Sequence, residues 1–396
     1  MAIETASMLA YTWDLYEEGL EQPLENIADV AGCNEIALAV SYHISTYFLP
    51  HNPKRKLYYG EHGAEYFYPD LRLYENTKIH PRVSDVVTGP EFLPDIVRAI
   101  KDKGLRFTAW VVYFYNHHLA RKYPECARMD ALGNRYLAQL CPANPDVRAY
   151  ALALTEDVVS NYEPQGLLIE SLSYLPFEYG FLNPKVLMEI TPRCQFLMGI
   201  CLCAHCRAAA QAAGLDADGF ANQVAAFLEQ ELVRNPTDAD RAPVSDEWLS
   251  EAFDGELALY LAARGEVAQS LFQAVVEKAR SFGVEEVHTS LGRSSHVSGL
   301  NQERVLPLID SIGAGLQAGS ADEMRSQVAA AREALPPDKR LSVGVAPATA
   351  ASHEEIYARI KAASEGGADG VSFYNYGLLR EEYFRWIGAA RELWTK

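Results

Sequence analysis

Short apolar runs alternate with longer helical patterns along almost the whole chain of 396 residues, and this alternation limits the fold more than any other feature. Runs rich in β-branched and aromatic residues, each followed by an amphipathic helix, are typical of parallel βα units. We expect eight strands, at 8–14, 35–43, 106–113, 166–172, 286–291, 312–317, 341–346 and 370–376. We expect helices between them at 23–31, 90–103, 145–161, 302–310, 321–334, 353–365 and 380–395.

Eight such units in succession predict a (β/α)8 TIM barrel of the α/β class. A doubly wound open sheet is the alternative, but no G-x-G-x-x-G turn follows the first strand. Two segments are too long for ordinary connections. The segment 45–88 predicts a long loop excursion after strand two, and the helical patterns within about 175–282 predict a helical insertion after strand four. We therefore expect residues 1–396 to form a single barrel domain that carries both additions.

Charge and composition limit the partners. Acidic residues outnumber basic ones by 53 to 35, so the formal net charge is −18. Such a surface repels phosphate backbones and anionic lipids, and we expect neither nucleic acid nor membrane as a partner. No apolar run approaches the ~20 residues of a bilayer span. The acidic start of the chain does not resemble a secretory signal, so we expect a cytoplasmic protein with reduced thiols. The sequence leaves a homo-oligomer open.

The run C-L-C-A-H-C at 201–206 places three of the seven cysteines within six residues. Thiolates and imidazoles that converge on one point are the usual ligands of zinc. With a fourth protein ligand the tetrahedral ion has no open position, so we expect a structural zinc. Alternatively, these small apolar side chains pack the start of a helix. The sequence itself allows Cys126, Cys141, Cys194 or His205 as the fourth ligand.

One stretch of the chain resembles family 42 β-galactosidases. Tyr123-Pro124-Glu125, Cys141-Pro142 and Asn144-Pro145-Asp146 are similar to the segment after the third strand in that family. The family also has a C-x-C-x2-C cluster after its fourth strand, and a cysteine upstream completes its zinc site. The resemblance therefore implies that zinc is held by Cys141, Cys201, Cys203 and Cys206.

Most of the chain also resembles a group of bacterial barrels that are described as hypothetical glycosyl hydrolases. The phrases that carry this resemblance are LPHNP at 49–53, GAEYFYPD at 63–70, IESL at 169–172, CLCAHC at 201–206 and SFYNYG at 372–377. The resemblance implies the barrel fold and leaves the reaction open.

Side chains at the C-terminal ends of barrel strands converge on the active site. Here these ends are rich in groups that hydrogen-bond sugar hydroxyls or stack on sugar rings, so we expect a small-molecule carbohydrate substrate. Adjacent histidines on a strand face opposite sides, so one of the pair at 117–118 is expected to be structural. The expected substrate-binding residues are Tyr42, His43, Trp110, Tyr115, Asn116, His117, His118, Tyr174, His288, Arg293, Gln317, Tyr374 and Asn375.

Glu170 ends the apolar strand G-L-L-I-E and is the first catalytic candidate. The apolar residues that precede it in the strand favour the protonated form that a general acid needs. Family 42 has its acid/base glutamate at the same strand end, although an asparagine precedes it there and Ile169 precedes it here. Alternatively, Glu170 pairs with Arg293 or a histidine and closes the top of the barrel.

Glycoside hydrolysis usually needs a second carboxylate, at about 5 Å for retention and about 6.5–9.5 Å for inversion. Family 42 has its nucleophile at the end of strand seven, but residues 342–347 (SVGVAP) contain no acid. We therefore predict Asp14 as the catalytic partner of Glu170, and Glu178 as the second choice; Glu61 and Glu65 are further loop candidates.

Three functions are compatible with this sequence. The first is a glycoside hydrolase for small soluble glycosides, with Glu170 as general acid/base. The second is a metal-dependent sugar lyase, isomerase or epimerase with His43, His288 and Glu170 among the ligands. The third is a non-catalytic sugar-binding barrel. We predict no organic cofactor, and we find no phosphate-binding loop motif.

Overall fold

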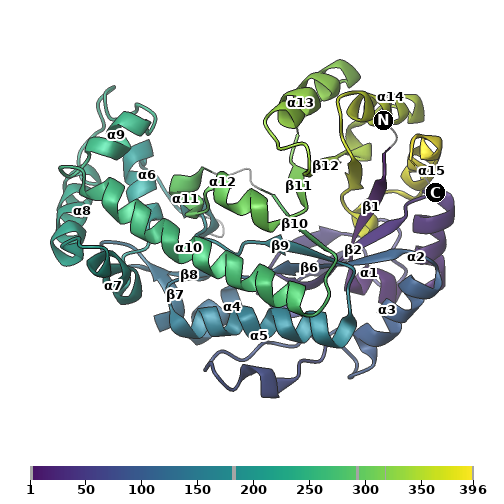
Figure 1. Ribbon diagram of the computed structural model, residues 1–396, viewed down its shortest axis with the longest axis horizontal. Coiled ribbons are helices and arrows are strands. Elements are labelled where there is room, and N and C mark those ends of the chain that lie inside the picture. Colours follow the sequence, from purple (N-terminus) through teal and green to yellow (C-terminus); the bar gives the residue numbers. More distant parts are fainter. Residues whose placement is uncertain (1–2, 181–183, 291–293, 317, 395–396) are drawn as a thin grey trace.

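The computed structural model describes residues 3–180, 184–290, 294–316 and 318–394. Eight parallel strands form a closed barrel, because β1 pairs with β2 on one side and with β13 on the other (Figure 1). The predicted (β/α)8 TIM barrel is therefore confirmed. The barrel strands are β1 (Thr5–Tyr11), β2 (Glu35–Tyr42), β6 (Arg106–Val112), β9 (Gly166–Glu170), β10 (Glu286–Thr289), β11 (Ser311–Ala314), β12 (Arg340–Gly344) and β13 (Gly370–Phe373).

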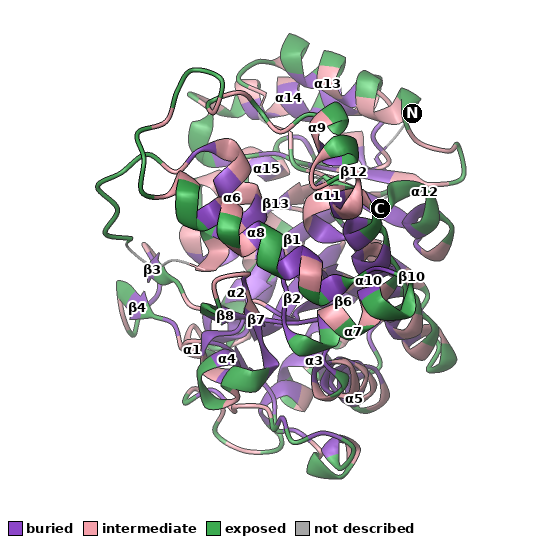
Figure 2. Cartoon of the chain, turned by 90° about the vertical axis from the view of Figure 1, so that its left-hand side faces the viewer, coloured by how far each residue is buried: buried purple, intermediate pink, exposed green. Residues whose placement is uncertain are grey.

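Helices surround the barrel, with their apolar sides on the strands and their polar sides exposed (Figure 2). The largest apolar core lies between the strands and these helices. Helix α5 begins with Pro145 in its first turn, and the Asn144 side chain accepts hydrogen bonds from two backbone N–H groups there. The helices outside the insertion are α1 (Thr12–Glu17), α2 (Glu21–Glu25), α3 (Phe92–Asp102), α4 (His117–Lys122), α5 (Pro145–Tyr162), α11 (Ser295–Ser298), α12 (Gln302–Val305), α13 (Ala321–Glu333), α14 (His353–Glu365) and α15 (Glu381–Gly388).

All eight expected strands form, but each ends earlier than the sequence predicts. In β1 the error changes the place of a candidate catalytic residue. The strand ends at Tyr11, and Asp14 lies in the first turn of α1, where its carboxylate accepts a hydrogen bond from the Tyr11 backbone N–H at 3.2 Å. The prediction that Asp14 ends the strand was wrong because the carboxylate starts a helix instead.

Helices between β9 and β10 form a lobe beside the barrel, on the left in Figure 1. This lobe is the helical insertion expected after strand four. It has an apolar core of its own, which includes the cysteine cluster. The single-domain organisation stays a prediction. The lobe helices are α6 (Pro192–Gly199), α7 (Ala204–Ala212), α8 (Ala217–Glu231), α9 (Asp246–Glu251) and α10 (Glu256–Ser281).

The excursion after β2 is held against the barrel by pairing and by buried hydrogen bonds. It contains a hairpin of β3 (Thr46–Phe48) and β4 (Leu57–Tyr59), and β5 (Ala64–Glu65), which pairs antiparallel with β2. The Tyr150 hydroxyl on α5 donates to Glu65 at 2.5 Å. A further hairpin, β7 (Ala127–Met129) with β8 (Arg135–Leu140), follows α4. Short turns are η1 (Asn26–Val30), η2 (Leu71–Tyr74), η3 (Pro124–Cys126), η4 (Phe177–Gly180), η5 (Leu306–Leu308), η6 (Pro347–Thr349), η7 (Tyr376–Leu378) and η8 (Arg391–Leu393).

An ion-pair network closes the N-terminal end of the barrel. The Arg106 guanidinium lies 3.3 Å from Glu35 and 3.3 Å from Glu286. Arg340 lies 2.8 Å from the same Glu286 carboxylate. Two cations therefore balance two buried or half-buried carboxylates at the bottom of the barrel.

Among the described helices, none combines the length and the apolar character that a membrane crossing requires.

Gly63→Ala should destabilise the fold strongly. Gly63 has φ +110°, and a Cβ there would lie 2.3 Å from Oδ1 of Asn116, the residue that caps α4. We expect the free energy of unfolding to fall by at least ~2 kcal/mol in urea titrations, because strain and overlap add. Gly19→Ala is the matched control, since Gly19 has φ +80° with open space around it and should cost only about 1 kcal/mol. Equal losses in both variants would contradict the overlap.

Candidate active site

A cavity of about 630 Å³ runs along the barrel axis and is lined by residues of all eight strands. Its lining includes residues at the starts of strands, such as Glu35 and Arg340, and residues at the ends, such as Glu170 and Tyr374. The volume lies within the usual range for small-molecule sites, which is about 300–1,000 Å³.

Glu170 lies at the C-terminal end of β9 and lines this cavity. Its Oε2 accepts a hydrogen bond from Nε1 of Trp110 at 2.7 Å, and Trp110 lies on the neighbouring strand β6. The other lining carboxylates that the structure describes are Glu35, Glu286 and Asp369, all at the N-terminal ends of strands. Glu170 is therefore the carboxylate that an incoming ligand meets at the active end of the barrel.

Three tyrosine hydroxyls meet beside Trp110. The hydroxyl of Tyr11 lies 2.5 Å from that of Tyr374 and 3.3 Å from that of Tyr42, and the last two are 3.4 Å apart. Burial raises the pKa of Tyr11 and Tyr42 above the ordinary range of a phenol, so both keep their protons at neutral pH. Tyr374 is 49% exposed and presents its side of the cluster to the cavity.

His288 faces the cavity from β10, and its Nδ1 lies 2.5 Å from the hydroxyl of Ser311. Burial lowers its pKa to about 4, so the imidazole is neutral at physiological pH. The His43 ring stacks on the Tyr42 ring with 4.3 Å between the ring centroids, and its centroid lies 4.7 Å from that of Tyr115. Burial lowers the pKa of His43 as well, so it too is a neutral hydrogen-bonding group.

The pair His117 and His118 begins helix α4 and does not continue a strand. His117 is buried, and neither of its ring nitrogens has a hydrogen-bond partner within the described parts of the chain. Burial, followed by the nearby His62, lowers the pKa of His117 to about 4. His118 is half-buried. Neither residue lines the cavity.

Three of the expected binding residues have local structural partners instead. Asn116 caps α4 by accepting from the Leu119 backbone N–H at 2.9 Å, and Asn375 accepts from the Gly377 backbone N–H at 3.3 Å. The Tyr174 hydroxyl lies 3.3 Å from the Cys206 sulfur, away from the cavity lining. Tyr115 also lies outside the lining and packs on Tyr179. Arg293 and Gln317 lie outside the described residues.

The two carboxylates predicted as partners of Glu170 do not line the cavity. Asp14 is fully buried, and desolvation raises its pKa to about 8, which leaves it protonated at neutral pH. Glu178 is exposed on η4 and accepts a hydrogen bond from Gln195. Both positions follow from the chain turning into short helices where the sequence suggested strand or open loop.

The sequence prediction missed Tyr11, Ser171, Ser311, Ser342 and Ser372, which face the cavity or its tyrosine cluster. The signal for most of them was available in the two-residue period of a strand. In β1, Ser7 and Leu9 line the cavity, and Tyr11 continues the same face. Small serines and glycines look like turn residues in a sequence, which conceals their place inside a strand.

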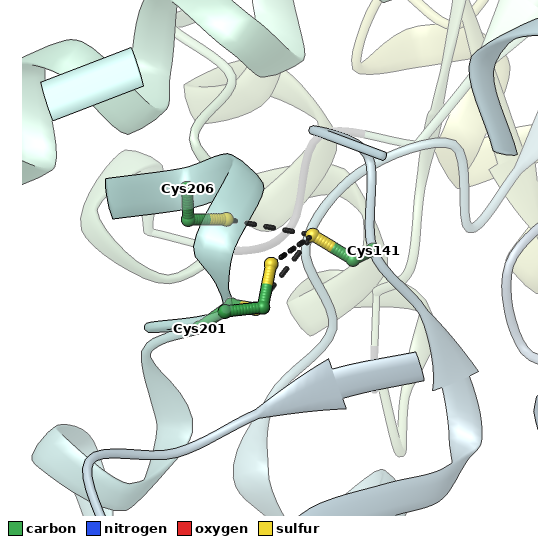
Figure 3. Close-up of side chains that lie close together, drawn as sticks. Cys141, Cys201 and Cys206 are labelled. Carbon is green, nitrogen blue, oxygen red and sulfur yellow. Dashed lines mark hydrogen bonds between the residues drawn. The ribbon is translucent and has the colours of Figure 1, made fainter. Parts of the chain in front are cut away.

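Four buried cysteines form a second centre, at the junction of the barrel and the lobe (Figure 3). The Cys141 sulfur lies 3.4 Å from that of Cys206, and 3.6 Å from those of Cys201 and Cys203. All four sulfurs lie within 4.8 Å of one another, so this set could hold a metal ion. Cys141, one of the candidates for the fourth position, therefore joins the three clustered cysteines.

The described residues contain no comparable set at the active end of the barrel. Among all the described residues, the four cysteines are the one group of three or more His, Cys, Asp or Glu side chains whose ligand atoms converge. His43, His288 and Glu170, the ligands expected for a catalytic metal, do not form such a group.

No protein-family model and no curated protein sequence matches the chain. Solved structures of glycosidases match its fold. The α-L-fucosidase isoenzyme 2 from Paenibacillus thiaminolyticus matches with a TM-score of 0.57 and 13% identity, over 98% of this chain and 49% of that one. A GH42 β-galactosidase from G. stearothermophilus matches with a TM-score of 0.56 and 12% identity, over 98% of this chain and 56% of that one.

The catalytic domain of the β-amylase from Paenibacillus polymyxa matches with a TM-score of 0.54 and 11% identity, over 98% of this chain and 99% of that one. The chain thus spans about half the length of the fucosidase and of the galactosidase. At these identities the likeness shows the fold alone, which is a (β/α)8 barrel. GH42 β-galactosidases are thus among the solved structures that share this fold.

Asp14→Asn should change how stability depends on pH. The carboxyl of Asp14 has a pKa of about 8 in the folded protein and an ordinary one near 3.8 when unfolded. As the pH rises from 4 to 8, the unfolded chain loses this proton first, so the folded wild type becomes less stable. Asparagine resembles the protonated form, and the variant should gain at least ~1 kcal/mol over the wild type between pH 5 and pH 9 in urea titrations. A difference that is constant with pH would count against the buried acid.

Proposed function

We propose that this protein is a carbohydrate-active enzyme of the glycoside hydrolase type, which acts on small soluble glycosides with Glu170 as general acid/base. One observation supports this most strongly: a carboxylate oriented by an indole N–H ends the fourth barrel strand, beside a cavity with aromatic and hydroxyl groups. This position supports the proposal because the fold is a glycosidase-like barrel, and barrel enzymes carry their catalytic groups at the C-terminal ends of the strands.

Trp110 fixes the proton-transfer group. Its Nε1–H donates to one oxygen of Glu170, and the second carboxyl oxygen has no hydrogen bond to the described residues. This second oxygen is the one that would protonate the leaving glycosidic oxygen as the bond to the anomeric carbon breaks. A fixed carboxyl loses less freedom in the transition state than a mobile one.

The tyrosine cluster supplies the second polar group of the site. Tyr374 offers its hydroxyl to the cavity, and Tyr11 and Tyr42 hold that hydroxyl by hydrogen bonds. In our proposal Tyr374 positions a sugar hydroxyl or the attacking water. The Glu170 carboxylate, having given its proton to the leaving oxygen, then accepts a proton from that water as the water bonds to the anomeric carbon. Asp14 and Glu178 have no role in this scheme, because neither lines the cavity.

Glu170→Gln tests the role of the acid. We expect kcat on neutral aryl and alkyl glycosides to fall by at least ~100-fold, because the amide cannot donate a carboxyl proton. Trp110→Phe keeps an aromatic ring but loses the N–H, and should lower kcat by about 10-fold and displace the pH profile. Glu178→Gln is the control, since that carboxyl is exposed outside the cavity, and it should turn over normally.

Unchanged turnover in Glu170→Gln would refute the general-acid role. If the wild type cleaves no glycoside in a broad panel while sugars raise its melting temperature, the protein is a sugar-binding barrel instead.

We also propose that Cys141, Cys201, Cys203 and Cys206 hold a structural zinc. A tetrahedral ion with Zn–S bonds of about 2.3 Å needs sulfurs about 3.8 Å apart, and the Cys141 sulfur lies 3.4–3.6 Å from the other three, which is close to this. The Met129 backbone N–H and the Tyr174 hydroxyl lie 3.4 Å and 3.3 Å from two of the sulfurs, as expected for groups that stabilise thiolates. A bound zinc would cross-link the barrel to the lobe.

Metal analysis of the purified protein should find one zinc per chain that survives dialysis. Cys141→Ser should remove it and lower the free energy of unfolding by at least ~3 kcal/mol, because metal binding is coupled to folding. Cys194→Ser is the matched control, since Cys194 is buried in the lobe but lies outside the converging set, and should keep the zinc. Retention of zinc by Cys141→Ser would contradict the assignment.

A further inference from the structure

The two halves of the barrel present different walls to the axial cavity. The strands β10 to β13 contribute mainly small and polar residues, whereas the strands β1, β2, β6 and β9 contribute most of the large apolar side chains, together with the polar residues Ser7 and Thr108. The polar wall consists of His288, Ser290, Ser311, Gly313, Ser342, Gly344, Gly370 and Ser372, and the facing apolar wall includes Leu9, Ala37, Trp110 and Leu168. In most barrels, layers of bulky branched side chains fill this space.

The space inside the barrel is open at a defined point. A Cβ built on Gly344, at the end of β12, would meet no other atom within 4 Å. At Gly313, in contrast, a Cβ would lie 2.9 Å from Nε2 of His288 and from the Ser290 hydroxyl. The open part of the lumen therefore lies along the β12 side of the axis, opposite the wall that carries Glu170.

A buried hydroxyl beside Glu170 lacks a partner. Ser171 follows Glu170 directly, lines the cavity and is only 9% exposed. Its Oγ makes no hydrogen bond to any residue that the structure describes. A buried hydroxyl without a partner costs free energy, so a ligand hydroxyl that reaches it would be favoured.

The charges at the bottom of the lumen are balanced, and Glu170 is the one described lining carboxylate at its upper end. At its bottom, Arg106 and Arg340 pair with Glu35 and Glu286. His288 is neutral at physiological pH because burial lowers its pKa to about 4. An anionic ligand group would find no free cation among these residues and would lose its hydration.

We infer that the barrel lumen below Glu170 is a binding chamber for one neutral, hydroxyl-rich group, such as a terminal sugar ring, which enters end-on. The apolar wall would contact the C–H face of the sugar, and the serine hydroxyls and His288 would bind its hydroxyls. Because the ion-pair network lies across the bottom, we expect the chamber to accept a chain end and not an internal segment of a polymer. The choice of a carbohydrate rests on the proposed function.

Filling the chamber tests this inference by binding alone. In calorimetric titrations we expect at least one neutral monosaccharide or methyl glycoside to bind the wild type, and the matching uronic acid to bind at least ten-fold more weakly. Gly344→Leu should weaken the neutral ligand at least ten-fold without lowering the melting temperature. Ala346→Leu is the matched control, because Ala346 is exposed and lies outside the lining, and it should bind within two-fold of the wild type.

Ser342→Ala is a second test, which adds no bulk to the chamber. It should weaken binding of the same ligand by about three-fold or more, because one hydrogen bond is lost. Full affinity in both Gly344→Leu and Ser342→Ala would overturn the chamber. Tighter binding of the uronic acid than of the neutral sugars, or no binding of any neutral sugar, would overturn the assigned ligand class.

These results separate the chamber from the proposed reaction. Glu170→Gln should still bind the neutral ligand within about three-fold, whatever its turnover. Loss of turnover in Glu170→Gln with unchanged affinity in Gly344→Leu would support the hydrolase and contradict the binding chamber. The opposite pair of results, normal turnover in Glu170→Gln and lost affinity in Gly344→Leu, would remove the acid role and leave the chamber.

Discussion

The pairing of β1 with both β2 and β13 closes the barrel, and the rest of the molecule depends on this closure. It brings the C-terminal ends of all eight strands to one rim, so residues far apart in the chain share one cavity. Trp110 reaches Glu170 because β6 and β9 are neighbours, and Tyr11 reaches Tyr374 because the first and last strands are neighbours. An open sheet of the same strands would separate the second pair.

The fold was predictable because βα alternation is a local property of sequence. Strand ends were not, since the residues that leave a strand are also compatible with continuing it. Thr12 and Trp13 favour strands, but the Asp14 carboxylate accepts a hydrogen bond from the Tyr11 N–H and starts a helix. The prediction thus placed a buried, protonated acid at the active rim, and overlooked Tyr11, the true last residue of that strand.

The site was predictable where position along a strand fixes direction. Glu170, Trp110, Tyr42, Tyr374 and His288 line the cavity as expected. Asn116 and Asn375 have side chains equally suited to a sugar and to a helix cap, and only the three-dimensional structure shows which use they have. The cysteines are a clearer case, because the close spacing of three thiols indicated a cluster, and the structure brings Cys141 to them in a set that could hold a metal ion.

Tyr174 connects the two centres of the molecule. It follows Glu170 by four positions, its hydroxyl contacts Cys206, and its ring lies under the Arg264 guanidinium at 4.0 Å. Its backbone N–H also donates to the Ser298 carbonyl, next to the end of α11. The path of the chain as it leaves the fourth barrel strand is consequently set from the lobe side. Oxidation of the thiol cluster would therefore disturb the segment of chain that follows Glu170.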